Sequence, residues 1–251
     1  MRIVTNRKLV NRNRSIATWL FLGTLGLLIG GFVFINYTFF TGEGPADWVF
    51  LLQALAIPVA FVLTIFSVRM TNNWAREPHP EKALPDGLKS VSKKSILYNY
   101  FHFPARHVLI APQGVYAIVT RWHDDEFTVD GDEWKTHKSS ISRFLSGMRM
   151  DGVGDPVRDA KRAAQHVSKA IADIAPDVEV QPLVVFVSPK VEITFEGESS
   201  VPILFADEKK SPNLNDYMRD LNRAQKDNIQ QRVTLPMTDE QIEAFESATL
   251  P

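Results

Sequence analysis

The apolar residues of this 251-residue chain are concentrated near its beginning. Residues 15–40 contain no charged side chain, and residues 48–68 contain none either. A helix needs roughly 20 apolar residues to cross the hydrocarbon core of a bilayer, and each run is long enough. Neither run has the polar face that a surface helix of a soluble protein shows. The pattern therefore predicts a transmembrane hairpin over residues 15–70, with helices at about 15–40 and 48–68.

Basic residues flank the two runs and are missing from the short connector between them. Lysine and arginine are enriched in the cytoplasmic flanks of membrane helices. We therefore expect a multi-pass protein of a bacterial inner (cytoplasmic) membrane, with the lipid bilayer as a partner and both termini in the cytoplasm. On this interpretation residues 1–14 are a basic cytoplasmic N-terminus. The basic residues are Arg2, Arg7, Lys8, Arg12 and Arg14 before the first run, and Arg69, Arg76 and Lys82 after the second.

Gly26 and Gly30 in the first run are four residues apart, a spacing that lets membrane helices approach closely. They could form the face of a dimer. They could also pack on Ala56 and Ala60, a matching pair of small residues in the second run. We favour the second interpretation, because a helix tethered by a short connector has the higher effective concentration.

The remainder of the chain has the composition of a linker followed by one domain. Residues 71–87 are rich in proline and charge and predict a linker. Residues 88–251 are long enough for a cytoplasmic domain. Two short apolar strands flank a Pro-Gln-Gly turn within residues 107–122, and Asp130-Gly131 predicts a second hairpin in the same sheet.

Helices and further strands follow these hairpins. Asp155-Pro156 is typical of a helix start, and Pro176 of a helix end. Residues 178–188 predict a strand that is buried on both sides. Two amphipathic segments predict closing helices, the second with a Thr238 and Gln241 capping box. We expect an α/β domain with a mixed, partly antiparallel sheet flanked by helices.

Four blocks of this domain are HVLIAPQGVYAIVTRW, Trp134, GDPVRDAKRAAQHVSKAI and VQPLVVFVSP. In their order and spacing they resemble the nuclease-related domain (NERD) family, in a bacterial variant with two N-terminal membrane helices. The resemblance implies a PD-(D/E)XK nuclease-like, or restriction-endonuclease-like, fold. It also implies that an aspartate and a glutamate on the two hairpin strands bind Mg²⁺. A lysine two residues after the glutamate then stabilises charge at the phosphate.

Residues of other types occupy the functional positions of the family in this chain. Arg106 stands at the aspartate position, Val119 at the glutamate position and Arg121 at the lysine position. Asp159 stands where the family has a helix glutamine. An arginine cannot lose its charge to become a metal ligand. We therefore predict a pseudoenzyme without catalytic residues, metal ligands or cofactor, which binds or scaffolds at the cytoplasmic membrane face.

Two alternatives remain open. Asp124, Asp125 and Glu126 follow the second hairpin strand and could form a displaced Mg²⁺ site of a membrane-tethered nuclease. A solvated turn is the favoured interpretation, because consecutive acids point in different directions and such residues are common in turns. The chain could also be an accessory subunit of a larger membrane complex, with a membrane or cytoplasmic protein as partner.

The charge balance argues against a broad nucleic-acid interface. Seven of the 28 basic residues and three of the 29 acidic residues precede Pro78, so the remainder has a net charge near −5. A nucleic-acid-binding domain usually has a basic footprint. A local basic patch beside the helix start stays open as an alternative to an ordinary solvated helix face. Its members would be Arg149, Arg158, Lys161 and Arg162.

Overall fold

The computed structural model describes residues 1–40, 47–137, 152–227 and 236–250, which belong to two units. A helical unit contains Lys8–Arg76 together with Ser139–Gly152. A globular unit combines Met1–Arg7, Glu77–Lys138 and Val153–Pro251. The helical unit is therefore an insertion, because the chain begins in the globular unit and returns to it.

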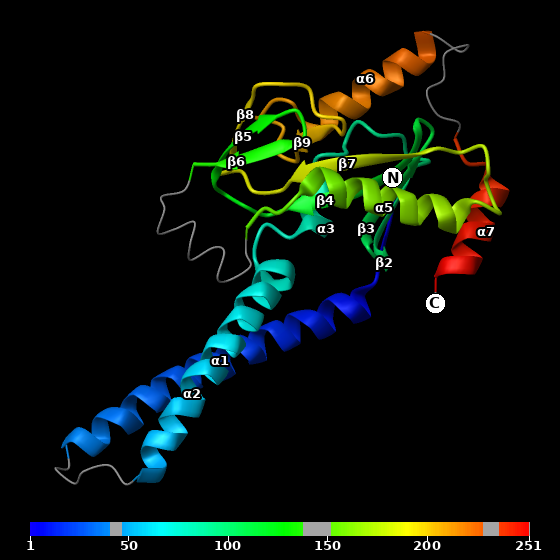
Figure 1. The fold of residues 1–251 in the computed structure, drawn as a ribbon. Coiled ribbons are helices and arrows are strands. Elements are labelled where there is room, and N and C mark those ends of the chain that lie inside the picture. The colour runs from blue at the N-terminus through cyan, green and yellow to red at the C-terminus, as the bar shows by residue number, and fades with distance from the viewer. Residues whose placement is uncertain (41–46, 138–151, 228–235, 251) are drawn as a thin grey trace. The chain divides into compact units, whose positions relative to one another are not determined.

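Two long apolar helices make up the described part of the helical unit (Figure 1). Helix α1 covers Arg7–Phe40, and α2 covers Asp47–Met70 with Pro58 in its interior. A π-helical turn, η1 (Thr71–Ala75), follows α2 directly. Both helices are long and apolar enough to cross a membrane, and most of their large apolar side chains are exposed. These helices coincide with the two runs expected from the sequence.

The glycine pair of α1 has an open face in this structure. A Cβ atom built on Gly26 or on Gly30 would meet no heavy atom within 4 Å among the described residues. A close approach of α2 would place backbone or side-chain atoms inside that distance. The packing of Gly26 and Gly30 on Ala56 and Ala60 stays a prediction, because the open face at the two glycines does not show which surface they contact in a membrane.

A mixed sheet of six described strands forms the centre of the globular unit, in the order β1-β2-β3-β4-β7-β9. The β2-β3-β4 neighbours are antiparallel, while β1 pairs parallel with β2, and β7 pairs parallel with both β4 and β9. This confirms the mixed, partly antiparallel sheet and the interior position of residues 180–186. The strands are β1 (Arg2–Thr5), β2 (Ile96–His102), β3 (Ala105–Ala111), β4 (Gly114–Arg121), β7 (Val180–Phe186) and β9 (Ile203–Phe205).

A second sheet contains β5 (Glu126–Asp130), β6 (Glu133–Thr136) and β8 (Glu192–Phe195). The expected hairpin at Asp130-Gly131 is present, with Gly131 at φ +59°, a conformation that glycine adopts readily. It does not extend the first hairpin as expected. The reason is that β5 pairs with β8, in parallel register, and not with β4.

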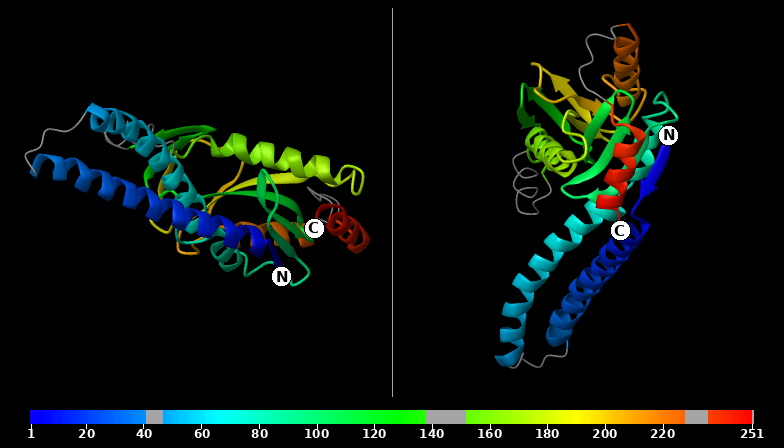
Figure 2. Two further views of the ribbon diagram at one scale, coloured as in Figure 1. Left: turned by 90° about the horizontal axis from the view of Figure 1, so that it is seen from below. Right: turned by 90° about the vertical axis from the view of Figure 1, so that its right-hand side faces the viewer.

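Helices cover both faces of the main sheet (Figures 1 and 2). Helix α5 (Pro156–Ile171) lies along β4 and β7 and buries the apolar stripe that the sequence predicts. On the same face, α7 (Asp239–Thr249) inserts Phe245 into the core and begins with the expected capping box. Helix α6 (Leu214–Asp227) buries Leu214 and Met218 on the opposite face.

Two segments of the globular unit differ from the domain limits expected from the sequence. Helix α3 (Pro80–Asp86) occupies much of the expected linker at 71–87, and its Leu84 is fully buried. Proline is well tolerated in the first turn of a helix, so a proline-rich stretch can still be helical. The first residues of the chain contribute a strand to the main sheet, because β1 pairs with β2 from Arg2 to Thr5.

Candidate functional site

The β3-β4 hairpin brings the family positions to one end of the main sheet. The antiparallel register pairs His107 with Ile118. One residue further along, the same register places Arg106 opposite Val119. Arg121 follows two residues after Val119 and therefore lies on the same face of β4. This face also carries Val115 and Ala117 and is the one that α5 covers. The register thus places positions 106, 119 and 121 on one face, at one end of the hairpin.

Arg121 is the most strongly held residue of this group. Its Nη2 lies 2.5 Å from Oδ2 of Asp159, and the Arg121 side chain is only 15% exposed. Its Nε donates to the carbonyl of Val153 at 3.1 Å, and its Nη1 donates to the carbonyl of Thr120 at 3.3 Å. Desolvation by burial lowers the pKa of Arg121, while Asp159 opposes this shift. The guanidinium is therefore satisfied from inside the protein.

Asp159 reaches Arg121 because of how α5 begins. The side chain of Asp155 accepts a hydrogen bond from the backbone N–H of Arg158 at 2.9 Å, which caps the helix, and Pro156 occupies its first turn. Asp159 then falls on the first turn, beside the end of β4. An ion pair between the lysine position and the glutamine position of the family therefore joins strand to helix.

The residues at these positions do not fit a magnesium site. Hard divalent cations need several oxygen ligands, preferably carboxylates. Arg106 and Val119 supply none, and the carboxylate of Asp159 is committed to a guanidinium. Among the described residues, no three histidine, aspartate or glutamate side chains are grouped as ligands of one metal ion would be.

The acidic run after β4 is only partly exposed. Asp124 and Glu126 are exposed and Asp125 is half-buried. The backbone carbonyl of Asp125 accepts a hydrogen bond from Glu192, at the place where β5 meets β8. These three residues are not one of the groups that could bind a metal within the described part of the chain.

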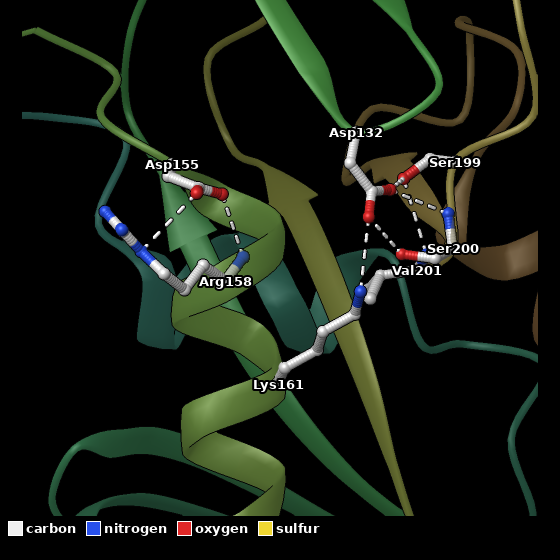
Figure 3. Close-up of polar contacts among 7 residues, drawn as sticks. All are labelled: Asp132, Asp155, Arg158, Lys161, Ser199, Ser200 and Val201. Atoms are coloured by element: carbon white, nitrogen blue, oxygen red, sulfur yellow. Dashed lines mark hydrogen bonds and ion pairs between the residues drawn. The ribbon is translucent and has the colours of Figure 1, made fainter.

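Carboxylates partly neutralise the basic residues beside α5 (Figure 3). Nε of Arg158 lies 3.4 Å from Asp155, and Nζ of Lys161 lies 3.2 Å from Oδ2 of Asp132. Arg162 is exposed on the same helix, and Arg149 lies outside the described residues. Of the three described residues in the expected patch, Arg158 and Lys161 are therefore in ion pairs.

Asp132 is the centre of a polar cluster that the sequence did not indicate (Figure 3). Its carboxylate accepts hydrogen bonds from the hydroxyl and the backbone N–H of Ser200 and from the hydroxyl of Ser199. The Ser200 hydrogen bonds chiefly, with smaller contributions from Lys161 and Ser199, hold the pKa of Asp132 below its usual range. The cluster joins the β5-β6 turn to the segment before β9 and to α5, which is a structural role.

A buried row of polar side chains crosses the other face of the main sheet. The Asn99 amide donates to Thr5 at 3.0 Å, and the Asn99 carbonyl lies 2.7 Å from Nδ1 of His107. Nε2 of His107 lies 3.5 Å from the Thr120 hydroxyl. Asn99 and His107 are fully buried, and burial lowers the pKa of His107 to about 3. Because these residues come from β1 to β4, only the strand order reveals the row.

The comparisons with known proteins bear on the same region. The family model of the nuclease-related domain (NERD) matches residues 80–187, from α3 to the end of β7. Comparison with curated proteins and with solved structures gave no match. The matched stretch contains the β3-β4 hairpin, the start of α5 and the Arg121–Asp159 pair. The chain therefore contains a nuclease-related domain at residues 80–187, preceded by two long apolar helices.

Proposed function

We propose that this chain is a membrane-anchored protein whose restriction-endonuclease-like domain does not cleave nucleic acid. The domain serves instead as a binding or scaffolding module at the cytoplasmic face of a bacterial inner membrane. The observation that carries this proposal is the Arg121–Asp159 ion pair at the centre of the family site. A partner of the domain is a protein and not a nucleic acid, in keeping with the acidic net charge and the paired cations of α5.

The ion pair argues against residual catalysis by the family mechanism for a chemical reason. Nuclease chemistry needs a metal ion near the scissile phosphate and a cation that is available to stabilise the charge that develops. Here the cation at the lysine position already donates to Asp159, Val153 and Thr120. Three of the five N–H donors of Arg121 are thereby engaged inside the protein, and no carboxylate at Arg106 or Val119 would hold the metal.

The membrane part of the proposal rests on α1 and α2, and the sheet adds a constraint on topology. β1 precedes α1, β2 follows α2, and the two strands pair from Arg2–Ile96 to Thr5–Asn99. This pairing supports a proposed topology in which both ends of the hairpin lie on one side of the bilayer, as two crossings would place them. The basic residues at these ends favour the cytoplasmic side.

The decisive experiment measures cleavage by the full chain in detergent. Labelled single- and double-stranded DNA and RNA are incubated with the protein and Mg²⁺ or Mn²⁺. We expect no cleavage above that of a mock preparation. Cleavage that disappears in the variant with Asp124→Ala, Asp125→Ala and Glu126→Ala would overturn the proposal in favour of a displaced active site.

A second experiment tests the assignment of the site positions. The variant with Arg106→Asp, Val119→Glu, Arg121→Lys and Asp159→Gln restores the family residues. We expect it to bind Mn²⁺ in a calorimetric titration, while the wild-type chain does not. If a variant with an unchanged circular dichroism spectrum still fails to bind, these are not the ligand positions.

A further inference from the structure

The cations of the helical unit are collected at one end of its hairpin. Between Lys8 and Arg76 the chain has two acidic residues, Glu43 and Asp47, and both lie at or beside the connector. The opposite end, where α1 begins and η1 ends, has no acidic residue within this unit. It carries five cations: Lys8, Arg12, Arg14, Arg69 and Arg76.

A hydrogen bond between the two helical segments brings these cations together. Nε of Arg14 donates to the carbonyl of Trp74 in η1 at 3.0 Å. With a rise of about 1.5 Å per residue, Lys8 and Arg12 lie within about 9 Å of Arg14 along α1. Arg69 precedes Trp74 by five residues, and its carbonyl accepts a hydrogen bond from the side chain of Asn73 at 2.8 Å. The cations at the start of α1 and the end of α2 therefore lie at one level along the hairpin, and together we call them the basic surface.

Three of the five cations face outward. Lys8, Arg12 and Arg69 are exposed, and in the part of the chain that the structure describes none of them is in an ion pair. Arg14 and Arg76 are half-buried. Arg14 is held by Trp74, so it positions the surface as well as adding charge to it.

This basic surface adjoins the exposed apolar part of the hairpin. Trp19, five residues after Arg14, is 72% exposed, and Phe66, three residues before Arg69, is 57% exposed. In a helix these separations are about one turn. The cations are therefore at the level where lipid headgroups lie when the apolar side chains are in the hydrocarbon core. Guanidinium groups bind phosphate oxygens through paired hydrogen bonds.

We propose that Lys8, Arg12 and Arg69 form a binding surface for anionic phospholipid headgroups, positioned by the Arg14–Trp74 contact. This inference rests on the membrane insertion of α1 and α2. Charge complementarity carries it, because the surface has positive charge only, and basic residues at a membrane surface select anionic over zwitterionic lipids. The proposed ligand is a phospholipid with a net negative headgroup, such as phosphatidylglycerol.

The test compares two lipids on the full chain in reconstituted vesicles. Spin-labelled phosphatidylglycerol and spin-labelled phosphatidylcholine are added separately, and electron paramagnetic resonance measures the fraction that the protein immobilises. We expect phosphatidylglycerol to associate roughly fivefold more strongly at low salt, about the effect of one cation at the membrane surface. The preference should approach onefold in 1 M salt, where the screening length is about 3 Å.

Variants assign the preference to this surface. The variant with Lys8→Gln, Arg12→Gln and Arg69→Gln should lose the preference and still immobilise both lipids. Arg12→Lys with Arg69→Lys keeps the charge and should retain most of it. A matched control, Lys94→Gln with Arg162→Gln and Lys169→Gln, removes three exposed cations of the globular unit and should leave the ratio unchanged.

The outcomes separate this inference from the proposed function. If neither lipid is immobilised, the helices are not inserted, and both proposals fail. Immobilisation without a preference in the wild-type chain would overturn the lipid surface alone. So would an unchanged ratio in the triple glutamine variant, or an equal loss in the control variant.

Discussion

Large apolar side chains are mostly exposed in the described part of the helical unit, whereas the globular unit buries them in its core. In α1 and α2, Trp19 and Ile57 are 72% and 70% exposed, whereas Phe186 and Leu109 of the main sheet are fully buried. Burial of apolar surface stabilises a soluble domain, and exposure of so much apolar surface to water is unfavourable. The comparison shows that burial of apolar side chains explains the fold of the globular unit but not that of the helical unit. Proposed membrane anchoring accounts for the difference.

Removing a core aromatic should have the largest effect and tests the globular side of this contrast. Phe186 is fully buried and stacks on Trp134, with ring centroids 5.6 Å apart. We expect Phe186→Ala to lower the free energy of unfolding by about 3–5 kcal/mol. Urea denaturation of the full chain in detergent, followed by tryptophan fluorescence, measures it. Phe66→Ala in α2 is the matched control, and an equal loss there would remove the contrast.

A charge in the middle of α2 tests the helical side. Ile57 is near the helix centre and is 70% exposed. An arginine at such a position costs about 2.5–3.5 kcal/mol of membrane insertion. We expect Ile57→Arg to reduce sharply the fraction of protein that resists alkaline carbonate extraction. Ile3→Arg, at an exposed position in β1, should leave this fraction unchanged; the opposite pattern would argue against insertion of α2.

Two ion pairs of α5, Arg121–Asp159 and Lys161–Asp132, provide a finer comparison within the globular unit. Arg121→Met keeps most of the packing but removes the contacts to Asp159, Val153 and Thr120, so we expect a loss of about 1–3 kcal/mol in unfolding free energy. Lys161→Met breaks an exposed pair and should cost less than about 1 kcal/mol. Urea titrations of both variants give the values. Equal losses would mean that Arg121 is not a buried anchor.

The pH dependence of stability should distinguish buried histidines from surface ones. Burial lowers the pKa of His107 from 6.5 to about 3, so the unfolded chain binds a proton that the folded chain does not. Stability should therefore be constant above about pH 6.5 for this group and fall towards pH 3, by about 1.4 kcal/mol per pH unit. His107→Gln should remove the contribution of one bound proton, about 1.4 kcal/mol per pH unit, from the slope of stability against pH. His102, lowered to about 4, still contributes in that variant.

Local patterns predicted most of the helices and both hairpins. The apolar runs of α1 and α2 and the stripe of α5 each satisfy a rule that applies within one segment. β1 escaped prediction because Arg2–Thr5 is short, lies among basic residues, and pairs with a strand that begins at Ile96. The sequence pattern did not predict β2, because this strand is irregular. It contains a bulge between Asn99 and His102, and Tyr100 has φ +66°, which interrupts the alternation of a strand.

The candidate site was also predictable from the sequence only in part. The residue types at positions 106, 119, 121 and 159 could be read from the resemblance, but the contact between Arg121 and Asp159 could not. That contact depends on how α5 lies on β4, which is a tertiary property. The same holds for Asp132, whose partners Ser199 and Ser200 are almost 70 residues away. Sequence patterns therefore indicated which residue types occupy these positions, but not that Arg121 and Asp159 form an ion pair.

The pairing of β1 with β2 also sets an order of events during synthesis. The first strand leaves the ribosome before α1, whereas its partner emerges only after α2 is complete. At about 5–20 residues per second, roughly 5 to 20 s separate the two strands. During that interval Arg2–Thr5 has no β2 to pair with. In the proposed membrane-anchored protein, the sheet can be completed only when both ends of the inserted hairpin lie on the side where the domain folds.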